Sequence, residues 1–192
     1  MLYICETNMK KQEQKYYKNL PIDSQGEEDF CIWMEECKNY GLIKNYRRGK
    51  SYLLSDVLHN NYVEQLKTKS RPKSQVILFG HGYNLDFEIE WTEDGKKFFC
   101  NTFGEKFTKM FICDESNTSY IETKPPFDFN NMTRLATLNI KWLWDKYKIF
   151  CQIVMNDDLF KKTFVPKQLL NYKNGKPKKF KYKVKTIEEF LK

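Results

Sequence analysis

The chain has 192 residues and a mass of 23.2 kDa, which allows one domain with a sizeable core and leaves little room for a second. Its formal net charge of +8 and pI near 9.0 favour polyanionic partners such as nucleic acid or anionic lipid. No stretch approaches 18 consecutive apolar residues, so we expect neither a membrane span nor an export signal. We therefore predict a cytoplasmic protein, in the cytoplasm of a host cell if its source is a phage or virus.

The six cysteines are scattered through the chain, without a C-x-x-C pair and without histidines at zinc-finger spacing. This pattern indicates neither a structural zinc site nor a disulfide framework, and reduced thiols are expected. The cysteines are Cys5, Cys31, Cys37, Cys100, Cys113 and Cys151.

The first confident element follows a polar arm, residues 1–20, that lacks firm periodicity and is expected to be frayed or to form a short helix. Ser24 and Glu27 have the S-x-x-E spacing of a capping box, and Gly41 is a stop signal, so we predict a helix from Ser24 to Tyr40. Its apolar stripe consists of Phe30, Trp33, Met34 and Cys37.

The next segments are less sharply patterned. Residues 44–54 mix tyrosines and leucines with basic residues and are interpreted as a strand or loop, whereas 58–69 is predicted as a helix. The apolar run 75–79 is typical of a buried strand.

Alternating residues then predict an antiparallel sheet. Residues 87–91 alternate, Asp94-Gly95 is a hairpin turn signal, and 97–100 would form the returning strand. Residues 111–113 and 119–124 are predicted strands on either side of a turn, and Pro125-Pro126 ends the second one.

The second half combines a helix, a strand and a basic tail. A helical stripe predicts a helix over 132–147, and 149–154 is the most strand-like segment, giving an α+β core with a βαβ-like end. The stripe consists of Leu135, Leu138, Leu143 and Trp144. From 159 to 187 there are ten lysines and no acidic residue, and in 180–185 lysines alternate with aromatic or apolar residues. One face of that segment can pack while the other presents ammonium groups to phosphates.

We accordingly divide the chain into three parts. Residues 1–20 form an N-terminal arm, 21–158 form the main domain, and 159–192 form a lysine-rich basic extension.

Chemistry is concentrated in an aspartate and a later Glu-x-Lys. Glu122 and Lys124 lie two apart on a predicted strand, so their side chains point the same way, and Asp86 precedes another strand. Carboxylate oxygens are the ligands that hard divalent cations prefer, and a neighbouring lysine can hold a water or stabilise charge on a phosphate. This trio indicates metal-assisted phosphodiester hydrolysis.

Together with Ser24-x-x-Glu27 and the helix–strand pair that follows, Tyr83-x-x-Asp86 and Ile121-Glu122-Thr123-Lys124 resemble the PD-(D/E)xK nuclease superfamily, in particular the phage endonuclease I type of Holliday-junction resolvase. The resemblance spans residues 24–154. It implies a restriction-endonuclease-like core, with a central mixed β-sheet flanked by helices, and here an inserted β-hairpin.

By this resemblance, Asp86 and Glu122 would bind Mg²⁺ or Mn²⁺, and the backbone carbonyl of Thr123 would add a ligand. Lys124 would be the catalytic lysine, and Glu27 would match the helix glutamate that contributes to a metal site in the family. DNA would be the partner, branched DNA in particular, and symmetric cutting of a junction would need a homodimer in which Glu27 completes a partner's site.

Several basic residues would contact DNA phosphates under this hypothesis: Arg134, Lys176, Lys178, Lys179, Lys181, Lys183 and Lys185. Two departures stand out. Pro125-Pro126 replaces the glycine usual after the lysine, and the 36-residue gap from Asp86 to Glu122 is long, which we attribute to an inserted hairpin.

Other interpretations stay open at this stage. Glu27 has a structural alternative as the third residue of the capping box, worth about 1 kcal/mol. His81 could be a catalytic base or a metal ligand, but a lone loop histidine is more often structural or exposed. The whole chain has two alternatives: a non-catalytic nucleic-acid-binding protein that keeps the nuclease fold, and a restriction-type, RNA or single-strand nuclease of the same fold.

Overall fold

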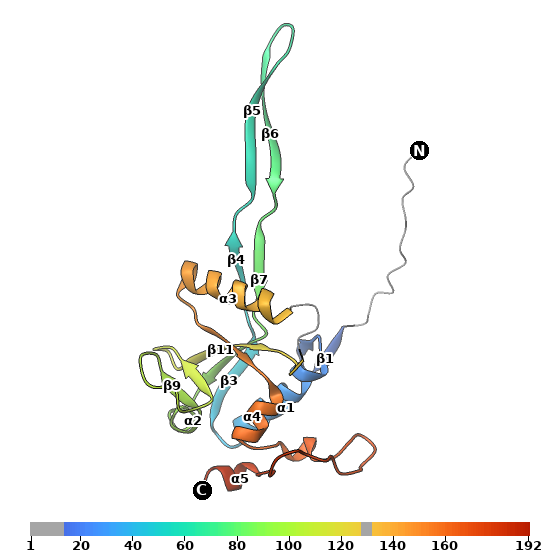
Figure 1. The fold of residues 1–192 in the computed structure, drawn as a ribbon, viewed down its shortest axis with the longest axis vertical. Helices are drawn as coiled ribbons and strands as arrows, with labels where there is room; N and C mark the ends of the chain where they lie inside the picture. The colour runs from blue at the N-terminus through green and yellow to red at the C-terminus, as the bar shows by residue number, and fades with distance from the viewer. Residues whose placement is uncertain (1–13, 128–131) are drawn as a thin grey trace.

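A four-stranded mixed sheet forms the centre of the computed structural model, which describes residues 14–127 and 132–192 (Figure 1). Its strand order is β12-β11-β8-β3, antiparallel except for the parallel pair β11 and β12, which α3 connects. This confirms an α+β protein with a central mixed sheet, helices on its faces and a βαβ-like end. The elements, in chain order, are β1 (Lys15–Tyr17), β2 (Leu20–Ile22), α1 (Gln25–Asn39), β3 (Ile43–Arg48), β4 (Ser51–Ser55), β5 (Leu58–Gln65), β6 (Ser70–Leu78), β7 (His81–Asn84), β8 (Phe87–Trp91), α2 (Glu93–Phe99), β9 (Cys100–Thr102), β10 (Phe111–Cys113), β11 (Thr118–Thr123), α3 (Met132–Tyr147), β12 (Cys151–Val154), α4 (Asn156–Lys162), the 3₁₀ helix η2 (Lys167–Leu169) and α5 (Ile187–Phe190).

The first helix confirms the prediction for Ser24 to Tyr40. Ser24 is the N-cap of α1, and its side chain accepts a hydrogen bond from the Glu27 amide at 3.1 Å. The return half of the capping box differs, because the Glu27 carboxylate accepts from the Asp23 amide at 3.2 Å. Glu27 therefore ties the approaching chain to the first turn of the helix.

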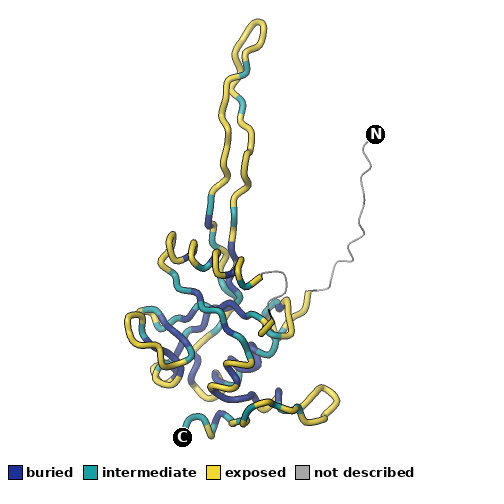
Figure 2. The backbone as a smooth tube through the Cα atoms, in the orientation of Figure 1, coloured by how far each residue is buried: buried dark blue, intermediate teal, exposed yellow. Residues whose placement is uncertain are grey.

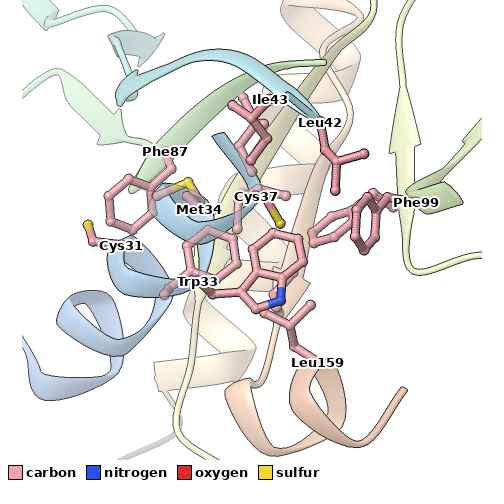
Figure 3. Close-up of a cluster of buried hydrophobic side chains, with 14 of the residues drawn as sticks. Cys31, Trp33, Met34, Cys37, Leu42, Ile43, Phe87, Phe99 and Leu159 are labelled. Carbon is pink, nitrogen blue, oxygen red and sulfur yellow. The ribbon is translucent and has the colours of Figure 1, made fainter. Parts of the chain in front are cut away.

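The predicted stripe of α1 packs into the main hydrophobic core, on one face of the sheet (Figure 3). Trp33 is fully buried at its centre, stacked with Phe30 at a centroid distance of 5.9 Å and edge-on to Phe99 at 5.2 Å. Removing a side chain of this size from a packed core typically costs about 3–5 kcal/mol. This core fixes α1, and with it Glu27, against the sheet.

A second, smaller core lies on the other face, under α3. Its buried members are Leu54, Tyr83, Leu85, Leu143 and Cys151. The bounds of α3 agree with the prediction, but most of its predicted stripe does not pack. Leu135, Leu138 and Trp144 remain 48, 48 and 38 % exposed, because Ala136, Asn139 and Leu143 are the buried residues of the helix.

The hairpin predicted between β8 and β11 is wrong. The connection consists of a helix and a pair of short parallel strands, β9 and β10. Asp94-Gly95 lies inside α2, whose N-cap Thr92 accepts a hydrogen bond from the Gly95 amide at 3.1 Å. A Cβ at Gly95 would lie 1.8 Å from the Leu42 carbonyl oxygen. The glycine is required by the close approach of helix and chain, and residues 97–100 form no returning strand apart from Cys100 at the start of β9.

The long hairpin of the molecule lies elsewhere, between β3 and β8. Residues 51–84 form an arm of two antiparallel ribbons. The inner ribbon, β4 with β7, packs under α3, and the outer ribbon, β5 with β6, stands clear of the body (Figure 1). The helix predicted over 58–69 is therefore wrong, since most of this segment is β5. The strand predicted at 75–79 exists as the end of β6, but it is exposed rather than buried: Ile77 and Phe79 are 56 and 83 % exposed.

The basic tail folds back onto the main core at the end of the molecule opposite the arm (Figure 1). Phe164, Val165 and Ile187 are fully buried in that core, and Phe180 and Tyr182 pack against it. The lysines between them are exposed, so the alternation of 180–185 separates a packed face from a charged one.

Ahead of α1, the described part of the predicted N-terminal arm is a short hairpin of β1 and β2. Residues 1–13, which include Cys5, lie outside the described residues. No helix in the described ranges combines the length and the apolar character that crossing a bilayer requires.

Candidate active site

The register of the sheet brings the two halves of the predicted trio together. Ile121 of β11 pairs with Phe87 of β8 in antiparallel register, so Asp86, which precedes Phe87, and Glu122, which follows Ile121, lie next to this last pair. Both residues therefore lie at the same end of the central sheet, 36 residues apart in sequence. Side chains alternate along β11, so Glu122 lies on the face of the second core, with Tyr83, whereas Thr123 lies on the face of α1.

Glu122 is held by two donors on its face of the sheet. Lys124 Nζ donates to Glu122 Oε1 at 2.6 Å, and the Tyr83 hydroxyl donates to Glu122 Oε2 at 2.9 Å. Glu122 is 5 % exposed, so both hydrogen bonds lie away from bulk water. Hydrogen bonds to a charged group contribute about 1.5–3 kcal/mol each, which is enough to fix the orientation of this carboxylate.

The pKa of Glu122 is raised above its usual value, chiefly by burial and then by the negative charge of Asp86. The Lys124 ammonium and the Tyr83 hydroxyl oppose that rise. Burial also raises the pKa of Tyr83, so its hydroxyl stays a proton donor to Glu122 at neutral pH. The environment of Glu122 thus disfavours its negative charge, and a bound cation would stabilise that charge.

Glu27 forms a matching group on the other face, at the start of α1. Its carboxylate is paired with the Arg48 guanidinium, which also reaches Asp23 Oδ2 at 3.1 Å. The pKa of Glu27 is raised, again first by burial and second by the charge of Asp86, while Arg48 lowers it. Glu27 and Glu122 therefore share one electrostatic neighbour.

That neighbour, Asp86, lies between the two groups. Its Oδ2 atom accepts hydrogen bonds from the Thr123 amide at 2.7 Å and from Thr123 Oγ1 at 2.8 Å. Among the described residues Asp86 takes part in no ion pair, unlike Glu27 and Glu122. The carboxylates of this cluster outnumber its two cations, Arg48 and Lys124, and Arg48 is shared with Asp23, so the site keeps excess negative charge.

A pocket of ≈ 220 Å³ opens where these groups meet. Glu27, Asp86, Thr123 and Lys124 line it, together with residues from the start of α3. Glu122 is buried and does not line the pocket, whereas Thr123 and Lys124 of the same E-x-K sequence do.

Comparisons with family models, with curated proteins and with solved structures find no match for this chain. Its function is therefore argued from the geometry of this site.

The donor set suits a hard divalent cation, because it consists of carboxylates with excess negative charge. In the present arrangement each carboxylate is satisfied by protein donors, and the described residues contain no group of three or more His, Cys, Asp or Glu side chains placed to bind one metal ion. A cation held by Asp86 and Glu122 would have to replace hydrogen bonds that Thr123 and Lys124 now donate.

The other predicted contact residues lie outside this pocket. Arg134 is exposed on the first turn of α3 and does not line the pocket. The predicted lysines of the tail lie on the surface of the folded-back segment, where Lys178 borders a separate pocket of ≈ 430 Å³ beside the first half of α1. His81 bonds through Nε2 to Asn139 Oδ1 at 2.8 Å and packs edge-on to Trp142 at 5.6 Å, which gives it a structural role.

Two residues of the site were missed at the sequence level. Tyr83 belongs to the quoted Tyr83-x-x-Asp86 segment, but nothing in the sequence indicates that its hydroxyl binds Glu122. Arg48 ends β3 and meets Glu27 only because β3 enters the sheet beside α1. Its only sequence signal is its place in the basic pair Arg47-Arg48.

Proposed function

We propose that this protein is a Mg²⁺- or Mn²⁺-dependent endonuclease that hydrolyses DNA phosphodiester bonds. The single observation that carries the proposal is the meeting of Asp86 with Glu122 and Lys124 at one end of the sheet, across a 36-residue connection. The chain has a net charge of +8, which favours a polyanionic substrate over a cationic one. Within the acidic site, Lys124 lines the pocket and can meet such a substrate.

Asp86 and Glu122 would hold the metal ion, with Glu27 and the backbone carbonyl of Thr123 as further oxygen ligands. A bound cation polarises a phosphate and lowers the pKa of a coordinated water. The residues favour this role because Asp86 forms no ion pair with another described residue and because Asp86 raises the pKa of both glutamates. A divalent cation would remove that repulsion.

Lys124 would act on the substrate side of the site. It lines the pocket while its Nζ atom is 2.6 Å from Glu122. From this position an ammonium group stabilises negative charge that develops on a phosphate, and the Glu122 carboxylate keeps the lysine oriented.

The same proposal extends to the fold and the substrate. The strand order, with β11 and β12 joined through α3 and α1 on the opposite face, supports a restriction-endonuclease-like core. Branched DNA remains the preferred substrate by the resemblance of the motifs. Paired cuts in a junction would require a homodimer, although Glu27 here lies beside Asp86 of its own chain.

The test is cleavage of four-way-junction, duplex and single-stranded DNA, and of RNA, by the purified protein with Mg²⁺ or Mn²⁺. Lys124→Ala is the informative variant and Lys148→Ala is the control, because Lys148 is a surface lysine that follows α3. We expect cleavage that EDTA abolishes, that Lys124→Ala loses and that Lys148→Ala keeps.

Each alternative has its own outcome in this assay. Metal-independent binding without cleavage of any substrate would refute the nuclease and support a non-catalytic nucleic-acid-binding protein. Cleavage restricted to RNA, single strands or particular duplex sequences would keep the site and change the substrate.

A further inference from the structure

The arm formed by residues 51–84 is the largest feature that the candidate site leaves unexplained. Its outer ribbon, β5 with β6, pairs with no other strand in the described part of the chain, and nearly all of its residues are exposed (Figure 2). An isolated two-stranded hairpin is marginally stable in water at best. The outer ribbon therefore contributes little to the stability of the fold, and we expect its role to lie in binding.

The foot of the arm is joined to the candidate site. Arg48, the partner of Glu27, lies three residues before the arm, and Asp86 lies two residues after it. The Gly49 amide donates to the Asp86 carbonyl at 3.2 Å, so the segments that enter and leave the arm contact each other at the site. A Cβ at Gly49 would lie 2.3 Å from the Cβ of Leu85, which explains a glycine at this crossing.

Side chains of the body hold this foot in place. Glu88, 4 % exposed, accepts from the Lys50 amide at 3.0 Å, and Lys146 of α3 donates to the Leu53 carbonyl at 2.9 Å. The direction in which the arm leaves the site is therefore fixed by both β8 and α3.

The tip of the arm is basic. Lys67, Lys69, Arg71 and Lys73 fall within seven residues that contain no acidic side chain. Only Lys73 is paired, with Glu64 of the facing strand at 3.4 Å. Within the described ranges the other three form no ion pair, and all three are exposed. Three uncompensated cations at the end of a ribbon match the charge of a phosphate backbone.

The length of the arm sets where that backbone would lie. Asp86 lies 17 positions after Lys69, and each step rises about 3.3 Å in an extended strand, so the tip reaches up to about 55 Å from the site. At 3.4 Å per base pair this corresponds to about 16 base pairs of B-form DNA. The major groove of such a duplex admits a two-stranded ribbon.

We propose that the arm is a second DNA-binding element, whose tip binds the phosphates of a duplex arm about 16 base pairs from the bond held at the Asp86 site. This inference rests on the proposed function for its substrate class, but not on cleavage. The lysine-rich tail lies at the opposite end of the molecule and cannot take this role on the same duplex segment (Figure 1).

The experiment measures binding to a series of duplexes from about 8 to about 40 base pairs in metal-free buffer, at several salt concentrations. The tip variant combines Lys67→Gln, Lys69→Gln and Arg71→Gln. The control variant combines Lys106→Gln, Lys109→Gln and Lys148→Gln, which removes the same charge from exposed positions on the body, outside both the arm and the basic tail. Circular dichroism and thermal melting establish that both variants are folded.

Wild type and the control variant are expected to gain affinity, about tenfold or more, as the duplex length passes about 16 base pairs. The tip variant should lack this gain, and its slope of log affinity against log salt on long duplexes should fall by about 2 to 3 units. A tip variant that keeps the gain, or one that loses affinity equally at all lengths, would overturn the proposal. So would a tip variant that changes only the oligomeric state, which would assign the arm to a second copy of the chain. Failure of cleavage alone, with the length-dependent gain intact, would count against the nuclease and not against the arm.

Discussion

Glu27, at the start of α1, and Glu122, near the end of β11, approach Asp86 from opposite faces of the sheet. Both are buried, both have one cationic partner, and both have a pKa raised by burial and by Asp86. They differ in their other hydrogen bonds. Glu27 also accepts from the backbone amide of Asp23, before α1, whereas the described donors to Glu122 are the side chains of Lys124 and Tyr83. A glutamate with a folding role cannot be assigned to catalysis from burial alone, and the comparison must be tested by substitution.

The largest effect is expected from Asp86→Asn, which removes the negative charge that raises the pKa of both Glu27 and Glu122. Asparagine keeps an oxygen that can accept from the Thr123 amide, so the local fold should survive. Loss of a bound cation would remove several kcal/mol of charge stabilisation, and we expect cleavage to fall by about 10³-fold or more. Steady-state cleavage rates measure this, and unchanged cleavage would remove Asp86 from the site.

Glu122→Gln and Glu27→Gln should separate the two glutamates. We expect a loss of about 10²–10³-fold in cleavage for Glu122→Gln, because it removes a charge from both the metal and Lys124. Glu27→Gln should lose about tenfold in cleavage. Its unfolding free energy at neutral pH should not fall, because the new amide oxygen can still accept from the Asp23 amide and because the raised pKa of Glu27 means that folding disfavours the charge that is removed. Equal losses of activity in the two variants would mean that Glu27 is a full member of the catalytic set.

The pH dependence of stability tests the shared electrostatics. A carboxyl group whose pKa is raised on folding contributes most to stability at pH values below its pKa in the unfolded state, near 4.5. That contribution is lost as the pH rises through its pKa in the folded state. Wild type should therefore lose more unfolding free energy between about pH 4.5 and pH 8 than the Glu27→Gln, Glu122→Gln double variant. Chemical denaturation in metal-free buffer measures the difference. Added Mg²⁺ should reduce it, whereas identical profiles would show that the two carboxyl groups are not destabilised.

The smallest effect is expected from Ser24→Ala, which removes the N-cap of α1 and leaves the Glu27 carboxylate in place. We expect a loss of about 1 kcal/mol in unfolding free energy and a change of less than about threefold in cleavage. Thermal melting and cleavage rates of the same preparation measure both. A large loss of cleavage would show that the cap, rather than the glutamate charge, controls the site.

The local elements that sequence patterns predicted well are those with a single strong signal. The helix at Ser24 combines a cap with a four-residue apolar stripe, and β11 ends at a pair of prolines. The bounds of α3 were predicted correctly, but of its predicted apolar stripe only Leu143 is buried in the core: Leu138 is 48 % exposed, whereas the neighbouring Asn139 is 8 % exposed.

The errors arise where distant parts of the chain decide the structure. Asp94-Gly95 has the signature of a turn, yet Gly95 is inside a helix because Leu42 passes too close for a side chain. Residues 58–69 have no distinctive period, and only their pairing with 70–78 makes them a strand. Strand register brought Asp86 and Glu122 together as predicted, but the contacts of Arg48 and Tyr83 depend on packing that no local pattern contains.

The central claim, that Asp86 and Glu122 form the metal site of a nuclease, is tested most directly by Mn²⁺ binding to the DNA-free protein, measured by titration calorimetry and by electron paramagnetic resonance. We predict saturable binding to wild type that Asp86→Asn and Glu122→Gln each weaken by about tenfold or more, and that Ser24→Ala leaves unchanged. Absence of binding, or binding that both carboxylate substitutions leave intact, would contradict the account.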